Sequence, residues 1–347
     1  MRALVAKRLE KCLLNNFVGH LRDDHRVFGP IARKYDVSFQ EAFSPDALDL
    51  GYTSTTLPPK RFFHHREAMM TFDGQGDCAI PELESEQPIL LLGVHSCDLN
   101  AILRQDKLFS RDFVDPYYKR RREKSSIMAL TCTEIGENCF CTSLGTGPTI
   151  KDGFDLLLTD LGETYLLEVG TQRGLAMVRK LSLPDASPSD FEEKDKRVNL
   201  AISKFKKRIA MQGLNDLVSN KFEDEVWTLI GESGGLAGCH ACLSCGNCSL
   251  VCPTCYCYEV SDALDMSLRT GTRTRELDSC QLLEYAKVAL GGNFRADRKS
   301  RTRHWMLCKF GAAAGQVNSS CVGCGRCIHS CPAHIDLTEV ARSLWGE

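Results

Sequence analysis

Long hydrophobic segments are missing from the sequence. The longest apolar runs, such as residues 88–94, are far shorter than the roughly 20 residues that a membrane-spanning helix requires. Near the N-terminus, Lys7, Arg8 and Glu10 interrupt the apolar residues, so no signal-peptide core is present. We therefore expect a cytoplasmic protein without a membrane span.

An excess of charge of one sign is missing as well. Lys and Arg total 43 while Asp and Glu total 45, which gives a formal net charge of −2. This balance provides no bulk attraction to nucleic acid or to an anionic membrane. The basic run at 295–304 fits a solvated face or a protein-docking surface better than a nucleic-acid site. The sequence also lacks a G-x-G-x-x-G fingerprint, a P-loop and an H-E-x-x-H motif, so we expect no nucleotide site and no hydrolytic zinc.

Cysteine, in contrast, is abundant. The chain has 19 cysteines among 347 residues. An odd number without an export signal argues against a disulfide framework and favours metal binding. Thirteen of the cysteines lie from Cys239 onward, which predicts a boundary near residue 235. We expect one domain at 1–232 and a cysteine-rich domain at 236–347.

Two cysteine runs in the C-terminal part have the same spacing. Residues 242–253 and 321–332 both follow the C-x₂-C-x₂-C-x₃-C-P pattern of two-cluster ferredoxins, in which the fourth cysteine of each run binds the cluster of the other run. The pattern predicts two 4Fe–4S clusters with crossed ligation. Structural zinc is the weaker alternative, because zinc sites made of cysteine pairs would leave the third cysteine and the Cys-Pro of each run unused. The predicted ligands are Cys242, Cys245, Cys248 and Cys331 for the first cluster, and Cys321, Cys324, Cys327 and Cys252 for the second.

The N-terminal domain has the pattern of a mixed α/β fold and carries a third candidate site. Residues 88–97 and 125–132 are predicted strands, and a helical pattern over 98–109 follows the first. If the two strands are parallel neighbours, their carboxyl ends bring four cysteines to one edge of the sheet, where α/β folds place ligands. The alternative is that these thiols are buried structural groups. The predicted ligands of a third 4Fe–4S cluster are Cys97, Cys132, Cys139 and Cys141.

A long stretch separates the two cysteine runs. Helical patterns over 260–268 and 277–290 predict an α-helical ferredoxin-like domain rather than a compact β-hairpin ferredoxin. The predicted fold is therefore an N-terminal mixed α/β domain followed by an α-helical ferredoxin-like dicluster domain. We expect the remaining cysteines of the second domain to pack beside the clusters, because no fourth ligand for a further centre is specified. They are Cys239, Cys255, Cys257, Cys280 and Cys308.

Several segments, in this order, resemble one family: the beta subunits of the cytoplasmic nickel–iron sulfhydrogenases, or NAD(P)-linked hydrogenases, which are related to the iron–sulfur component of anaerobic sulfite reductase. The resemblance implies an iron–sulfur electron-transfer subunit without a substrate site of its own. Its partners would be a flavoprotein subunit that binds FAD and NAD(P) and a catalytic redox subunit, nickel–iron hydrogenase in the first instance. The resemblance also supports the third cluster. The segments are 58–69, 93–102, 115–123, 137–148, 153–162, 242–260, 277–280 and 321–336.

The residues leave other functions open. The same relay would serve an anaerobic sulfite reductase or another flavin-linked complex. An exposed cluster, helped by a surplus thiol such as Cys308, would instead make the chain a direct sulfur or polysulfide reductase. A zinc-stabilised interaction or nucleic-acid module is a further alternative, which a colourless, zinc-containing protein would support.

Overall fold

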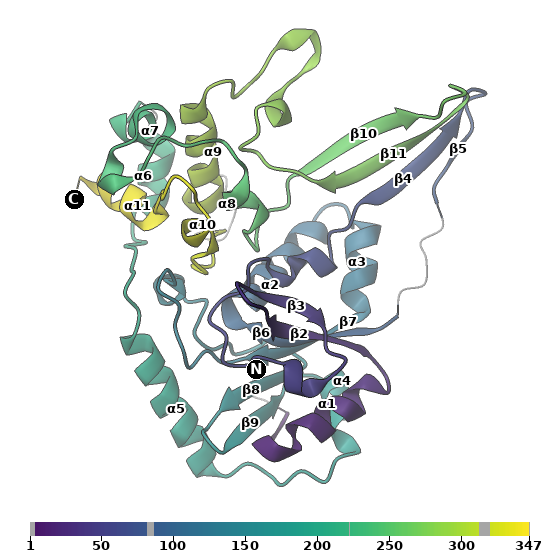
Figure 1. Ribbon diagram of the computed structural model, residues 1–347, viewed down its shortest axis with the longest axis vertical. Helices are drawn as coiled ribbons and strands as arrows, with labels where there is room; N and C mark the ends of the chain where they lie inside the picture. Colours follow the sequence, from purple (N-terminus) through teal and green to yellow (C-terminus); the bar gives the residue numbers. More distant parts are fainter. Residues whose placement is uncertain (1–3, 82–86, 222, 312–319, 347) are drawn as a thin grey trace.

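A seven-stranded sheet lies at one end of the computed structural model, which describes residues 4–81, 87–221, 223–311 and 320–346 (Figure 1). The strand order is β1-β9-β8-β7-β6-β2-β3. The four central strands β8, β7, β6 and β2 are parallel, whereas β3, β9 and β1 each pair antiparallel. The strands are β1 (Val5–Glu10), β2 (Arg26–Ala32), β3 (Val37–Glu41), β6 (Ile89–His95), β7 (Ser125–Leu130), β8 (Leu156–Asp160) and β9 (Thr164–Val169).

Helices cover both faces of this sheet, because the parallel strands are apolar on both sides. Leu90 and Leu92 of β6 belong to the core formed with α1 and α4, while Leu91 packs with α2 and α3 on the opposite face. The strands predicted at 88–97 and 125–132 are confirmed as β6 and β7, which pair in parallel. The helices of this part are α1 (Leu14–Arg22), α2 (Ser96–Phe109), α3 (Pro116–Glu123), α4 (Gln172–Arg179) and α5 (Pro188–Ser203).

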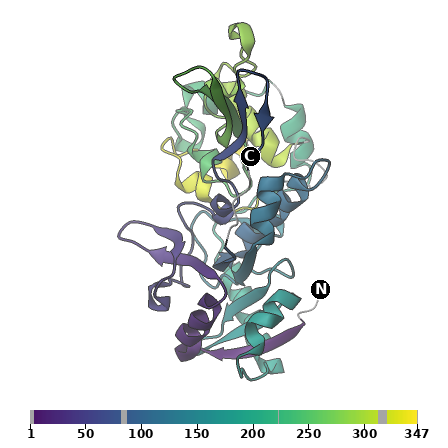
Figure 2. The same ribbon diagram turned by 90° about the vertical axis from the view of Figure 1, so that its right-hand side faces the viewer.

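A second sheet, of order β10-β11-β4-β5, projects from the molecule as an arm (Figures 1 and 2). It combines the hairpin β10 (Tyr258–Leu264) and β11 (Thr270–Leu277) with β4 (Glu67–Asp73) and β5 (Cys78–Ala79). Because β4 and β5 come from the N-terminal part, this sheet crosses the boundary predicted near residue 235.

The helices predicted at 260–268 and 277–290 are wrong. Residues 258–277 form the hairpin, and only short 3₁₀ turns at 284–286 and 289–291 follow. Val260 and Leu264 have the spacing of a helix face, but both side chains are about half exposed on a strand. The alternating threonines of β11 determine the local structure, since β-branched side chains fit a pleated surface. The ferredoxin-like part is therefore not purely α-helical.

The remaining C-terminal helices surround one apolar core that contains Trp227, Phe310 and Leu344. Figure 2 shows this part stacked against the end of the α/β layer. No helix in the described ranges is long and apolar enough to cross a bilayer. The helices are α6 (Leu214–Asn220), α7 (Glu225–Thr228), α8 (Asn247–Leu250), α9 (Arg298–Phe310), α10 (Arg326–His329) and α11 (Leu337–Trp345).

Candidate iron–sulfur sites

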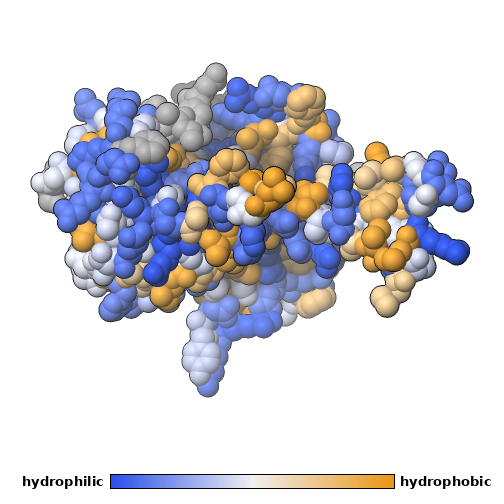
Figure 3. All heavy atoms as spheres, turned by 90° about the horizontal axis from the view of Figure 1, so that it is seen from above, coloured by the Kyte–Doolittle hydropathy of each residue, from blue (hydrophilic) through white to orange (hydrophobic). Residues whose placement is uncertain are grey.

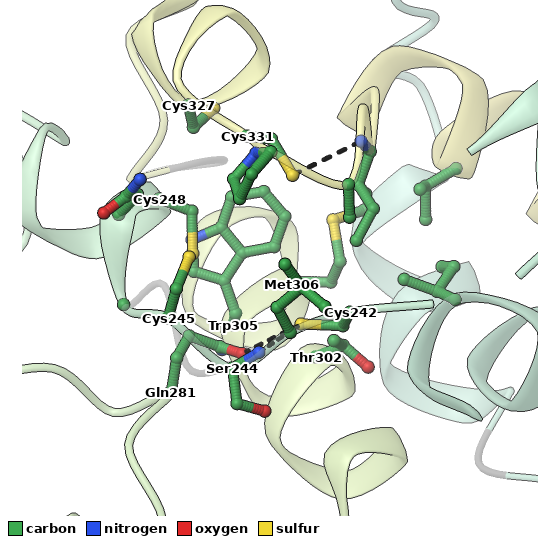
Figure 4. Close-up of a pocket in the computed structure, with 18 residues that line it drawn as sticks. Cys242, Ser244, Cys245, Cys248, Gln281, Thr302, Trp305, Met306, Cys327 and Cys331 are labelled. Atoms are coloured by element: carbon green, nitrogen blue, oxygen red, sulfur yellow. Dashed lines mark hydrogen bonds between the residues drawn. The ribbon is translucent and has the colours of Figure 1, made fainter. Parts of the chain in front are cut away.

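The cysteines predicted to bind the first cluster line one cavity, here called the first cavity (Figure 4). Backbone N–H groups point at two of the sulfurs: Ser244 donates to Cys242 Sγ at 3.4 Å, and Ile335 donates to Cys331 Sγ at 3.4 Å. Trp305 and other apolar side chains complete the wall. The cysteines are Cys242, Cys245, Cys248 and Cys331.

The cysteines predicted for the second cluster line a separate cavity, the second cavity. Cys321 Sγ accepts a hydrogen bond from Gly323 N at 3.3 Å. The fourth cysteine of each run thus lies with the first three of the other run, as the crossed assignment predicts. The cysteines are Cys252, Cys321, Cys324 and Cys327, and Lys309 and Phe140 also line the cavity.

The four cysteines of the N-terminal part line the third cavity, at the carboxyl ends of β6 and β7. Cys97 lies in the first turn of α2, directly after β6, and Cys132 follows the end of β7. The loop after β7 then supplies Cys139 and Cys141. The parallel pairing on which the predicted site depended is therefore present, and it brings together residues far apart in the chain.

Each set of cysteines surrounds a space rather than a point. Within the described ranges, no three His, Cys, Asp or Glu side chains are arranged to hold a single metal ion. A four-iron cluster takes one thiolate at each iron, so its ligands stand at the corners of a cube instead of around one ion. The geometry of the three cavities fits the larger group.

Unsatisfied donors at two cavities provide a second test of the fit. Trp305 Nε1 at the first cavity and Ser96 Oγ beside the third are buried and have no hydrogen-bond partner among the described residues. Leaving such a donor unpaired costs about 1–3 kcal/mol. In Figure 4 the indole nitrogen points toward the side of the cavity that carries Cys248. The bridging sulfides of a cluster would supply the missing acceptors.

The thiols themselves are poor anions without a metal. Burial raises the pKa of Cys324 to about 12 and that of Cys321 to about 11, and it also raises the pKa of Cys97 and Cys248. A coordinated thiol is deprotonated outright, so metal binding removes this cost. Cys252 differs: a hydrogen bond from the Cys255 thiol, aided by Lys309 and Lys60, lowers its pKa.

Neighbouring cavities share walls. Cys327 and Trp305 line both the first and the second cavity. Cys324 lines both the second and the third. The three cavities therefore follow one another in a row, with the second in the middle.

The second and third cavities are joined by a tightly packed contact. Phe140 N donates to Gly323 O at 2.9 Å, and a Cβ on Gly323 would lie only 2.6 Å from Cys141 Cα. Gly325, which the spacing suggested would approach a cluster, instead lies against the backbone of Asn138. These glycines allow the second cysteine run to lie directly on the loop that carries Cys139 and Cys141.

A buried ion pair fixes the same contact. Arg326, between two predicted ligands, donates to both carboxylate oxygens of Asp98 at 2.6 and 2.7 Å and to Thr55 O at 2.8 Å. Arg326 is 4% exposed and Asp98 is fully buried. His95, at the third cavity, stacks on Tyr52 with ring centroids 3.9 Å apart, and burial, followed by Arg326, lowers its pKa to about 3. This imidazole is therefore neutral.

The surplus cysteines lie around the first and second cavities. The thiol of Cys257 contacts that of Cys280, whose hydrogen bond is the main cause that lowers the pKa of Cys257 to about 6. Cys308 Sγ lies 3.6 Å from His304 Nε2, and Cys255 contacts Cys252. Cys239 is buried in the core of the C-terminal helices. None of these thiols lines any of the three cavities.

The comparisons define first a class of domain. Residues 241–335 match the family model of a 4Fe-4S dicluster domain. The chain is also 38% identical, over 335 residues, to Sulfhydrogenase 2 subunit beta of Pyrococcus furiosus, and the match covers 93% of each chain. The chain therefore belongs to the sulfhydrogenase beta-subunit family, and the resemblance seen in the sequence is confirmed. No solved structure matches. These findings support an iron–sulfur electron-transfer subunit with 4Fe–4S clusters that works with partner subunits.

Proposed function

We propose that this chain relays electrons through three 4Fe–4S clusters, one in each of the three cavities. One observation carries the proposal: each set of four cysteines lines its own cavity, and successive cavities share a cysteine wall. The bound clusters would accept and release single electrons. The chain's own residues hold the irons by thiolates, donate N–H groups to sulfur and keep water from the second cavity.

The partners follow from the family. We propose that a flavoprotein subunit binding FAD and NAD(P) lies at one end of the relay and that a nickel–iron catalytic subunit lies at the other. The first cavity is the better docking end, because Cys245 is exposed there and Leu243 at its wall is 60% exposed. Figure 3 looks onto the upper end of the molecule and shows apolar side chains gathered on this face and on the projecting arm. Such exposed apolar side chains are typical of protein interfaces.

The test is the iron content and spectroscopy of anaerobically purified protein. Three clusters require about twelve irons per chain, four for each cluster. We expect reduced protein to show paramagnetic signals from interacting clusters. Fewer than about eight irons, with no such signals, would contradict even the two-cluster relay. About eight irons that are insensitive to Cys139→Ala would remove the third cluster alone.

Direct sulfur or polysulfide reduction is the second candidate, and the exposure of Cys245 at the first cavity favours it. A cluster reachable from solvent can meet a small substrate without a partner protein. The isolated chain, reduced by a dye, would then form sulfide from polysulfide. If sulfide appears only after a flavoprotein is added, the relay function stands; sulfite reduction in the purified complex would assign it to the related sulfite reductases.

A further inference from the structure

Two lysines are buried beside the second cavity. Lys309, in the last turn of α9, is 4% exposed, lines the cavity and donates to Thr254 Oγ1 at 2.9 Å. Lys60, from the segment Pro59–Phe62 of the N-terminal part, is also 4% exposed and donates to Cys255 O at 2.9 Å. Burying an ammonium group is costly unless an anion accompanies it.

Thiols, rather than carboxylates, dominate the surroundings of both lysines. Burial alone would lower the pKa of Lys309, but the neighbouring cysteines, Cys252 and Cys255 foremost, raise it well above its usual value. Burial lowers the pKa of Lys60, and the same two thiols oppose that effect. Among the described residues, no carboxylate forms an ion pair with Lys60. The anion that suits this pair of lysines is therefore one that occupies the second cavity.

The other two cavities differ in charge. The described side chains that line the first cavity include no Lys, Arg, Asp or Glu, and its donor is the neutral Trp305 Nε1. The third cavity contains Arg326, but Asp98 neutralises that charge. α9 therefore presents a neutral indole to the first cavity and, one turn later, an ammonium to the second.

Building on the proposed relay, we propose that Lys309, supported by Lys60, makes the cluster of the second cavity the easiest of the three to reduce. Four thiolates outweigh the positive charge of the iron–sulfur core, so the site is anionic and gains one more negative charge when it accepts an electron. A nearby fixed positive charge stabilises that reduced state. The flavoprotein partner supplies the electron, no bond forms or breaks, and both lysines keep their protons. Lys309 acts through the cluster and is a positioning residue.

The proposal is tested by redox titration of Lys309→Met, followed by electron paramagnetic resonance at each potential. The signal of the second cluster is identified as the one missing from Cys252→Ala. We expect its reduced-to-oxidised ratio at a fixed potential to fall at least tenfold, which is a drop in midpoint potential of 59 mV for one electron. The midpoint of the first cluster should move less. Lys309→Arg keeps the charge and should stay within a factor of about three of the unaltered protein, by the same relation.

Lys299→Met is the matched control. Lys299 belongs to the same helix but lies 3.8 Å from Glu223 at the surface and lines none of the three cavities. We expect no change in any midpoint. If Lys309→Met does not retain its iron, Lys60→Met decides the matter, since Lys60 removes a charge without altering the cavity wall. It should lower the same midpoint by a smaller amount.

Two results separate the failure of this proposal from the failure of the relay. Full iron content with an unchanged midpoint for the second cluster in Lys309→Met, or in Lys60→Met where the first variant has lost iron, overturns the role of the lysines and leaves the relay intact. Unaltered protein with too little iron for two clusters overturns the proposed function itself.

Discussion

Replacing Arg326 by methionine is expected to destabilise the folded chain by about 3–5 kcal/mol, the usual cost of removing one partner of a buried ion pair. The guanidinium makes two hydrogen bonds with Asp98 and two with Thr55, at 2.6 to 2.9 Å. Methionine fills a similar volume but leaves the fully buried Asp98 carboxylate without a counter-charge. The loss falls on the contact between the second and third cavities.

The assay is urea unfolding of anaerobic, cluster-loaded protein, followed by circular dichroism and by cluster absorbance. With a slope of about 3 kcal/mol per molar urea, the midpoint should fall by at least about 1 M. Arg342→Met, which breaks an exposed pair with Glu339, should change stability by less than about 1 kcal/mol.

A second variant tests the cause. Asp98→Asn combined with Arg326→Met removes both charges and should recover much of the loss, because the penalty arises from an unpaired buried charge. If the double variant is as unstable as the sum of the two single variants, the ion pair is not the reason for the effect, and the reasoning is refuted.

Three further predictions concern the cavities. Cys252→Ala should remove mainly the cluster bound by the second run and Cys331→Ala the one bound by the first; quantitative paramagnetic resonance of each variant checks this, and the opposite pattern would mean uncrossed ligation. Gly323→Ala should lose iron and melt lower than Gly145→Ala, because both glycines have φ of 64° but only Gly323 faces backbone at 2.6 Å; equal melting temperatures would contradict the close-approach argument. Iodoacetamide labelling of Cys257, located by peptide mapping, should rise through pH 6 and level off near neutral pH, since its pKa is lowered to about 6 and the thiolate is the reactive form; a rise only above pH 8 would show an ordinary thiol.

The cysteine spacing predicted more of the site than of the fold. The runs at 242–253 and 321–332 identify eight residues whose grouping the cavities reproduce, because a ferredoxin-type loop encodes its ligand geometry locally. The buried strands β6 and β7 were predictable for a similar reason: their apolar runs are long enough to require burial on both faces. The hairpin β10–β11 was missed because Val260 and Leu264 satisfy the helical period as well as they satisfy a strand.

The side chains around the clusters were not predictable from local pattern. Lys309 follows the apolar residues of α9, where a lysine would ordinarily extend its ammonium to solvent. Nothing in the sequence near 309 announces that Lys60 lies on the other side of the same thiols, because that arrangement depends on contacts between residues far apart in the chain. The spacing also gave Gly325 a role toward the cluster, whereas it is a neighbouring loop that it approaches.

These long-range contacts mean that the cavities are built jointly by the two parts of the chain. Phe140 from the N-terminal part lines the second cavity, and Cys324 from the C-terminal part lines the third. Arg326 lies between two ligands of the second run and is held by Asp98, in the same helical turn as Cys97. Any shift of the second run therefore moves walls of both cavities at once. A relay benefits from this construction, because electron transfer depends on the separation of neighbouring clusters, and a shared rigid wall keeps that separation fixed.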